Sequence, residues 1–328
     1  MKNKVTLLLV VALLISVFAG CASAAPAKKF VVGFAQVGSE TEWRIAMSKE
    51  VQDAFAASDR FELIFSDAQQ KQENQIAAMR TFLQRKVDAI MFAPIVATGW
   101  DALMTEAKDA GIPVILVNRR ATMTIGDIED YSLCYVGPDN IYAGELAAQL
   151  MVDQFKDVQG PVNLVLLEGT VGASAAVDRS TGISNVLGKQ DKLQVFAAQS
   201  GDFNRSKAKE VMESIIKSAQ ARNVTIHAVI GHADDMNIGA IQALEEAGLR
   251  PGADVKLVGV DGVRAAFEAM VEGKYSATVE NPLGYGNKVI EILTAYFDNG
   301  TTPEKWVKLF NQAYTQEEAA AALPNRTF

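Results

Sequence analysis

Short apolar runs alternate with longer amphipathic segments along residues 30–260 of this 328-residue chain. The apolar runs are rich in Val, Ile, Leu and Phe, and polar or turn-forming residues lie between them. Runs of this length and composition are typical of buried strands. We therefore predict strands at 30–35, 61–65, 89–93, 113–117, 162–167, 193–197, 228–230 and 256–260.

Helices are expected between these strands. The segment after 61–65 carries Ile76, Met79 and Leu83, a spacing that places all three on one face of a helix. Further amphipathic segments predict helices at about 42–57, 100–110 and 205–219.

The strands at 89–93 and 113–117 are apolar throughout, which indicates burial on both faces of a parallel sheet. The alternation of strand and helix restarts at residue 162. Two successive runs of this kind predict an α/β protein with two doubly wound parallel-sheet lobes.

The first residues have the layout of a secretory signal peptide. Lys2 and Lys4 precede an apolar core at 5–19, and small residues at 22–24 provide a cleavage site. The core is shorter than the ~20 residues that a membrane-spanning helix needs. We expect removal of residues 1–24 and export to the periplasm. A lipoprotein anchored at Cys21 is the alternative, because the sequence FAGC at 18–21 loosely resembles a lipobox.

Composition argues against several classes of function. The formal charge of −8 becomes −10 once Lys2 and Lys4 are removed, and no block of Lys and Arg occurs. We therefore do not expect nucleic acid or an anionic membrane surface as a partner. Cys134 is then the remaining thiol, so no intramolecular disulfide is expected. Two histidines are too few for a His-rich metal site, and we expect no metal and no cofactor.

Candidate binding residues follow the predicted strands, because ligands of doubly wound sheets bind beyond the carboxyl ends of the strands. They are Glu40, Glu42, Trp43, Arg44, Asn118, Arg119, Asp178, Arg179, Phe203, Asp234, Asp235 and Asp261. Planar charged groups suit the hydroxyls of a sugar, and an aromatic face packs against its C–H face. For Glu42, Asp178 and Asp234, a helix cap or a surface ion pair is an equally good interpretation, because they lie near helix N-termini.

No motif predicts catalysis. The chain has no Gly-x-Ser-x-Gly elbow, no Walker A loop and no Gly-x-Gly-x-x-Gly fingerprint. The glycines of GTVG at 169–172 open a helix and could hold an anion, but such glycines more often let a turn close. We therefore expect a binding protein without catalytic residues rather than an enzyme.

A series of short segments supports a more specific interpretation. They are VGSE at 37–40, WR at 43–44, QQKQENQI at 69–76, AP at 93–94, VATGW at 96–100, GTVGAS at 169–174, DR at 178–179, QSGDF at 199–203, RSK at 205–207, DDM at 234–236 and DGV at 261–263. With these segments in this order, the chain resembles the periplasmic sugar-binding proteins of ABC importers of the ribose/galactose type, and among them the galactofuranose-binding branch.

The resemblance implies the fold of a type I periplasmic binding protein, in which a monosaccharide lies between two lobes. Three segments would connect the lobes, near Pro138, Asn281 and Val307. The N-terminal lobe would comprise 28–138 and 282–306, and the C-terminal lobe 139–281 and 307–328.

The resemblance also implies roles for individual residues. Trp43 would stack on the sugar, and Asp261 would accept a pair of hydroxyl hydrogens. Hydrogen bonds to the hydroxyls or the ring oxygen would come from three arginines, Arg44, Arg119 and Arg179. The walls would include Glu40 and Phe203.

Two positions depart from the family's pattern. Asn118 stands where the family usually carries Asp, and Ala233 stands where it usually carries Asn. An unpaired hydroxyl in a dry site costs ~1–3 kcal/mol, so both changes predict an altered sugar preference. Ala233 is expected to open space beside Asp261.

The leading hypothesis is a monomer that delivers a monosaccharide, galactofuranose-like or a related pentose or hexose, to ABC permease subunits in the inner membrane. The alternative is a sensor component that presents its loaded form to a chemoreceptor or sensor kinase. The sequence leaves open the sugar, its anomer and ring form, and the choice between transport and signalling.

Overall fold

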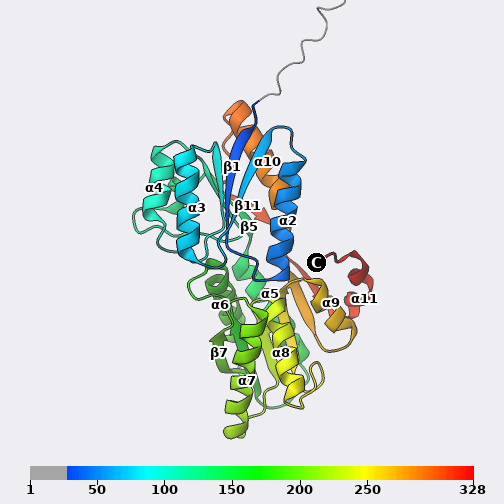
Figure 1. Cartoon of the computed structure of the whole chain (residues 1–328). Coiled ribbons are helices and arrows are strands. Elements are labelled where there is room, and N and C mark those ends of the chain that lie inside the picture. The colour runs from blue at the N-terminus through cyan, green and yellow to red at the C-terminus, as the bar shows by residue number, and fades with distance from the viewer. Residues whose placement is uncertain (1–27) are drawn as a thin grey trace, which may run out of the picture.

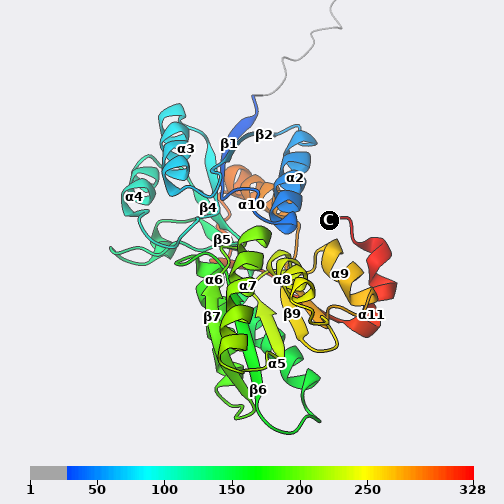
Figure 2. The same cartoon turned by 60° about the horizontal axis from the view of Figure 1, so that its bottom comes forward.

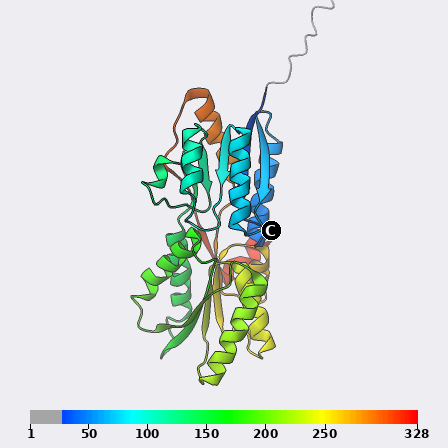
Figure 3. The same ribbon diagram turned by 60° about the vertical axis from the view of Figure 1, so that its left-hand side comes forward.

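The computed structural model describes residues 28–328, which form two α/β lobes, one above the other (Figures 1 and 3). Each lobe is built on a six-stranded sheet with helices on both faces. The two doubly wound lobes predicted from the sequence are therefore confirmed. The predicted signal peptide and Cys21 lie outside the described residues.

The sheet of the N-terminal lobe is parallel throughout, with the strand order β11-β5-β4-β3-β1-β2. Its strands are β1 (Phe30–Gln36), β2 (Phe61–Asp67), β3 (Ala89–Phe92), β4 (Val114–Val117), β5 (Cys134–Pro138) and β11 (Trp306–Leu309). Its helices are α2 (Glu42–Ala56), α3 (Gln72–Arg85), α4 (Asp101–Asp109) and α10 (Tyr285–Asn299). α2 and α10 cover one face of the sheet, and α3 and α4 cover the other (Figure 1).

The C-terminal lobe repeats this plan with the strand order β12-β10-β9-β8-β6-β7. Its strands are β6 (Val162–Glu168), β7 (Leu193–Ser200), β8 (Ala228–Gly231), β9 (Lys256–Asp261), β10 (Ala277–Glu280) and β12 (Gln312–Thr315). Its helices are α5 (Asn140–Gln154), α6 (Ser174–Leu187), α7 (Arg205–Ala221), α8 (Asp234–Glu246), α9 (Arg264–Val271) and α11 (Gln316–Ala322). α9 and α11 pack together beside the C-terminus (Figure 2). β12, at the edge of this sheet, runs antiparallel to β10, whereas the other strands of the lobe pair in parallel.

Burial on both faces explains the continuous apolar strands. In β3, Ala89 and Met91 belong to the core beneath α2, whereas Ile90 and Phe92 belong to the core beneath α3 and α4. A central parallel strand between two helical layers has no solvent-facing side, so every position must be apolar.

Three segments connect the lobes. The first joins β5 to α5 and the second joins β10 to α10. The third joins β11 to β12. The family resemblance implied a third crossing near Val307, but Val307 pairs with Val136 in the N-terminal sheet, so the chain crosses after Leu309.

Polar caps begin two of the helices that follow strand ends near the space between the lobes, α2 and α7. The side chain of Thr41 accepts the N–H of Arg44 at 3.0 Å, and that of Asn204 accepts the N–H of Lys207 at 2.9 Å. Each cap satisfies an N–H that has no partner within its helix. The caps therefore fix the turn after β1 and the turn after β7, from which cavity residues project. Within residues 28–328, no helix is long and apolar enough to cross a membrane.

Candidate ligand-binding site

A cavity lies between the lobes, at the carboxyl ends of both sheets, and buried side chains of both lobes line it. From the N-terminal lobe come Glu40, Thr41, Trp43, Arg44, Asn118 and Arg119. From the C-terminal lobe come Ala175, Arg179, Phe203 and Asp261, and Asn281 belongs to the second crossing segment. Eight of the twelve candidate binding residues therefore lie together, and the exceptions are Glu42, Asp178, Asp234 and Asp235.

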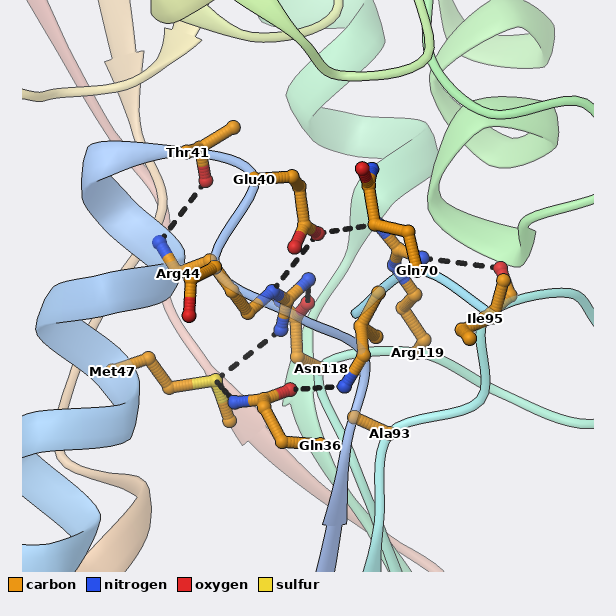
Figure 4. Close-up of polar contacts among 12 residues, drawn as sticks. Gln36, Glu40, Thr41, Arg44, Met47, Gln70, Ala93, Ile95, Asn118 and Arg119 are labelled. Atoms are coloured by element: carbon orange, nitrogen blue, oxygen red, sulfur yellow. Dashed lines mark hydrogen bonds and ion pairs between the residues drawn. The ribbon is translucent and has the colours of Figure 1, made fainter. Parts of the chain in front are cut away.

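One carboxylate holds two arginines in the N-terminal wall (Figure 4). Glu40 Oε1 accepts from Arg44 Nε at 3.3 Å and from a terminal nitrogen of Arg119, also at 3.3 Å. The Glu40 side chain is only 1% exposed, so its charge is compensated by these two cations rather than by water.

Arg44 is fixed from several directions, as Figure 4 shows. One terminal nitrogen donates to Asn118 Oδ1 at 2.9 Å, and the other lies 3.3 Å from Met47 Sδ. The guanidinium also lies 5.0 Å from the centre of the Trp43 ring, a cation–π distance. Asn118 in turn donates to the Tyr285 hydroxyl at 3.3 Å, which links this wall to the first turn of α10.

Arg119 is anchored through the loop after β3. It donates to the Ile95 carbonyl at 3.1 Å, and Ile95 N–H donates to Gln75 Oε1 at 3.0 Å. Gln75 also donates to Ala93 O at 2.6 Å, so one buried amide holds this loop. Burial and the nearby Arg44 guanidinium lower the pKa of Arg119 to about 9, which leaves it charged at neutral pH.

The C-terminal wall is built around Arg179, on α6. Arg179 Nε donates to Asn140 Oδ1 at 3.2 Å, and a terminal nitrogen donates to the His232 carbonyl. The remaining terminal nitrogen lies 3.7 Å from Asp261 Oδ1. This last pair is longer than a hydrogen bond, so both groups keep capacity for a ligand.

Asp261 ends β9 in a strained conformation. Its φ is 128°, a left-handed value that side chains other than glycine rarely adopt, and such strain concentrates at functional sites. Its carboxylate accepts from Asn281 Nδ2 at 3.3 Å. Burial raises the pKa of Asp261 to about 6 although the Arg179 charge opposes the shift.

A second buried carboxylate supports Asp261 from behind. Asp234 Oδ2 accepts the N–H of Gly262 at 2.7 Å, and Oδ1 accepts from the hydroxyls of Tyr275 at 2.7 Å and Thr278 at 2.9 Å. Burial, together with the neighbouring Asp261 charge, raises the pKa of Asp234 to about 8. Asp234 therefore positions the turn that carries Asp261.

Phe203 forms an aromatic wall between arginines of both lobes. Its ring centre lies 5.1 Å from the Arg119 guanidinium and 5.9 Å from that of Arg179. The ring packs directly on Gly169, where a Cβ atom would approach it to 2.0 Å. Gly169 is therefore required for close approach of Phe203.

Three buried polar atoms of the cavity have no hydrogen-bond partner within residues 28–328. They are Glu40 Oε2, Arg119 Nε and Asn281 Oδ1. An unpaired buried polar group is costly, so these atoms call for a ligand or water that both donates and accepts. A hydroxyl does both, and the arginine, carboxylate, amide and aromatic groups around the cavity suit a polyhydroxylated molecule.

Asp235 is not at the cavity, contrary to the sequence-based expectation. Its carboxylate pairs with Arg205 and accepts the N–H of Glu42 at 2.8 Å, outside the lining residues. For Glu42, Asp178 and Asp234 the sequence left open a binding role and a structural role, and none of the three lines the cavity. The structure therefore favours a structural role for all three. Asp178 pairs with Arg120 at 2.6 Å.

The expectation for Ala233 is also wrong. Ala233 is fully buried in the apolar core and does not line the cavity, so it opens no space for a ligand beside Asp261. Its methyl group lies at the N-cap of α8, where it makes no side-chain hydrogen bond to the helix. Of the two departures, Asn118 is the one at the ligand site.

Sequence reasoning missed Asn281 as a cavity residue, although it placed a crossing segment there. Asn281 follows β10, so the rule of searching beyond strand ends would have found it had the short strand ATVE been recognised. Thr41 and Ala175 also line the cavity, and neither residue type carries a signal in sequence.

In the described part of the chain, no group of three or more His, Cys, Asp or Glu side chains is arranged to hold a metal ion.

Comparison with known proteins agrees with this geometry. The family model described as "Periplasmic binding protein domain" matches residues 32–301. The chain belongs to this family. The sequence of this periplasmic binding protein is 43% identical to that of the galactofuranose-binding protein YtfQ of Escherichia coli, and the match covers 95% of this chain and 96% of that protein.

Solved structures of the family share its architecture. One, from Mycobacterium smegmatis in complex with β-D-fucofuranose, is 40% identical with a TM-score of 0.85 and covers 90% of this chain and 94% of its own. Another is the binding component of the arabinose ABC transporter of Shewanella sp. ANA-3, bound to α- and β-L-arabinofuranose. It is 39% identical with a TM-score of 0.84, covering 90% of this chain and 95% of that chain. The family resemblance stated from sequence is confirmed.

Proposed function

We propose that this periplasmic binding protein captures a neutral monosaccharide between its lobes and delivers it to the permease of an ABC importer. The observation that carries the proposal is the set of unpaired buried atoms Glu40 Oε2, Arg119 Nε and Asn281 Oδ1, which belong to residues lining one cavity between the lobes. Two acceptors and one donor, each without a partner in the described residues, match the hydroxyl groups of a sugar.

A furanose ring is the favoured form of the sugar. The three relatives described above are named for, or hold, galactofuranose, fucofuranose and arabinofuranose, at 39–43% identity. We propose a pentose or hexose in this ring form, with Trp43 and Phe203 against its apolar surface and Asp261 accepting two of its hydroxyl hydrogens.

Entry of the sugar requires the lobes to separate. Arg44, Arg119, Arg179 and Asp261 are each at most 4% exposed, so a ligand reaches them when the three crossing segments act as a hinge. The closed, loaded form then presents both lobes together to permease subunits in the inner membrane. We expect the protein to act as an exported, periplasmic monomer without catalytic activity.

The permease role is favoured over the sensor alternative. The relatives that share more than 30% of their residues over most of the chain include a galactofuranose-binding protein and a fructose import binding protein. Import is therefore the proposed role of this chain.

Thermal-shift screening followed by calorimetry tests the proposal. The panel comprises galactose, arabinose, fucose, fructose and ribose, with galacturonate as an anionic probe and Asp261→Ala as the variant without the acceptor. A neutral sugar at 100 times its Kd should add ~2.7 kcal/mol of stability, and small-angle scattering should show compaction. If no neutral sugar shifts the melting temperature, or the variant responds as strongly, the proposal is wrong.

A further inference from the structure

A cluster of three charged residues joins the two lobes outside the cavity. We define the rim clasp as Glu42 from the N-terminal lobe and Arg205 and Asp235 from the C-terminal lobe. Arg205 donates to Glu42 Oε1 at 2.6 Å and, through Nε, to Asp235 Oδ1 at 2.9 Å. The backbone N–H of Glu42 donates to Asp235 Oδ2 at 2.8 Å.

The clasp combines one contact within a lobe with two contacts across the lobes. Arg205 begins α7 and Asp235 lies in the first turn of α8, so their pair persists when the lobes separate. The bonds to the side chain and to the N–H of Glu42 exist only when the lobes are together. Asp235 therefore positions the Arg205 guanidinium within the C-terminal lobe, and Glu42 binds both residues when the lobes close.

Burial strengthens the cross-lobe bond to Asp235 more than the cross-lobe bond to Glu42. The Asp235 side chain is 5% exposed, whereas those of Arg205 and Glu42 are 35% and 38% exposed. On closure the buried Asp235 carboxylate gains the backbone N–H of Glu42, and Arg205 gains a second carboxylate through an ion pair that solvent partly screens. None of the three residues lines the cavity.

We propose that the rim clasp sets the affinity of the protein without contacting its ligand. Because its cross-lobe bonds form only in the closed arrangement, it shifts the equilibrium between open and closed forms by a fixed free energy. Removing it should weaken binding of every ligand by the same factor and leave the rank order of ligands unchanged. The inference rests on the proposed capture of a sugar between the lobes.

Calorimetry with Arg205→Gln tests the shared factor. We expect the Kd of each sugar in the panel that binds the native protein to rise about three- to tenfold, by one common factor. Arg205→Lys keeps the charge and loses the forked geometry, so its effect should be smaller. The matched control is Arg250→Gln, whose ion pair with Asp254 stays within one lobe and whose side chain is 76% exposed. This control should leave every Kd unchanged.

A double-mutant cycle assigns the effect to the cross-lobe bond. Glu42→Gln should weaken binding by a similar factor, and the Glu42→Gln, Arg205→Gln double variant should be less than additive, because both changes break the same pair. A neutral sugar carries no charge, so raising the salt concentration should weaken its binding to the native protein more than to the double variant.

Hydrogen exchange provides a readout that works with or without sugar. Glu42 N–H opens α2 and has no partner within the helix, so its protection reports the bond to Asp235. We expect protection in the native protein, stronger with sugar, and a loss of protection in Arg205→Gln. Arg44 N–H, which Thr41 caps within the lobe, should stay protected in both.

Three results would overturn the inference: unchanged Kd values, factors that differ among sugars, or a Glu42 N–H that exchanges equally fast in native protein and variant. Failure of the proposed function is a separate outcome. In that case no sugar binds the native protein, and exchange at Glu42 still decides whether the clasp holds the lobes together.

Discussion

The two walls of the cavity compensate their buried charges in different ways. In the N-terminal wall, Glu40 bridges Arg44 and Arg119, so opposite charges are paired at short range within one lobe. In the C-terminal wall, Arg179 and Asp261 are 3.7 Å apart, and each depends on supporting groups such as Asn140 and Asp234. Both walls keep capacity for a ligand, because Glu40 Oε2 and Arg119 Nε have no hydrogen-bond partner within residues 28–328, and the Arg179 and Asp261 side chains are too far apart to bond to each other. The walls differ in how their charges are compensated without a ligand, and this compensation is weaker for Arg179 and Asp261. We therefore expect the C-terminal wall to carry the larger share of ligand affinity and, through Asp261, of its pH dependence.

Arg179→Ala should produce the largest loss of sugar binding, ~2–3 kcal/mol or roughly 30- to 150-fold in Kd. The substitution removes a charged donor and leaves the buried Asp261 without its cation. Calorimetry measures the loss, and circular dichroism checks that the variant is folded. An unchanged Kd would remove Arg179 from the site and reverse the ranking of the two walls.

Glu40→Gln tests the opposite wall and should cost less, about 1–2 kcal/mol or roughly 5- to 30-fold. Gln retains an oxygen for one arginine, but it removes the charge that compensates Arg44 and Arg119. The cavity becomes more positive, so galacturonate should bind the variant better relative to galactose than it binds the native protein. A ratio of affinities that does not change would show that Glu40 plays no part in excluding anions.

Lowering the pH from 7 to 5 should weaken sugar binding through Asp261, whose pKa is raised to about 6 by burial. Hydroxyl donors stabilise the carboxylate, so the pKa in the complex lies below that value and binding releases a proton. Affinity therefore falls as pH drops through 6, by at most about tenfold per pH unit. Titrations at several pH values measure this slope. Asp261→Asn should bind weakly with little dependence on pH, and a native affinity that is constant from pH 7 to 5 would contradict the assignment.

Asp234→Asn should have the smallest effect, a shift of the melting temperature by about a few degrees. The pKa of Asp234 is raised to about 8, above its unfolded value of about 4. The native state therefore holds this proton more tightly than the unfolded state, and the resulting stability is lost as pH rises from 4 to 8. Melting curves at pH 4, 6 and 8 should show that the melting temperature of the variant, relative to that of the native protein, rises with pH. If the melting temperature of the variant falls relative to that of the native protein as pH rises, Asp234 is an ordinary ionised carboxylate.

The lobes and most of the cavity could be predicted from the sequence. Apolar runs such as 89–93 mark strands because burial on both faces admits no polar residue. The strand-end rule then located Arg44, Arg119, Arg179 and Asp261 because parallel strands deliver their carboxyl ends to one edge of the sheet.

The strands beside the crossing segments were missed. β10 and β11 are four residues long and contain charged side chains, and β5 contains Gly137 and Pro138. Their pairing comes from the fold around them rather than from a local pattern, so no periodicity reveals them. Asp235 was misplaced for a related reason, because a residue near a strand end can turn toward the other lobe instead of toward the cavity.

The hydrogen bond from Trp43 Nε1 to the Asn281 carbonyl, at 2.7 Å, makes this tryptophan a natural optical probe. The indole lies in the cavity wall and at the second crossing segment at once, so its emission responds both to a bound ligand and to movement of the lobes. Trp100 bonds to Val96 O at 2.7 Å within the N-terminal lobe and provides a constant background. Ligand capture can therefore be followed in real time in the unlabelled protein, through a fluorophore that the chain already carries at its hinge.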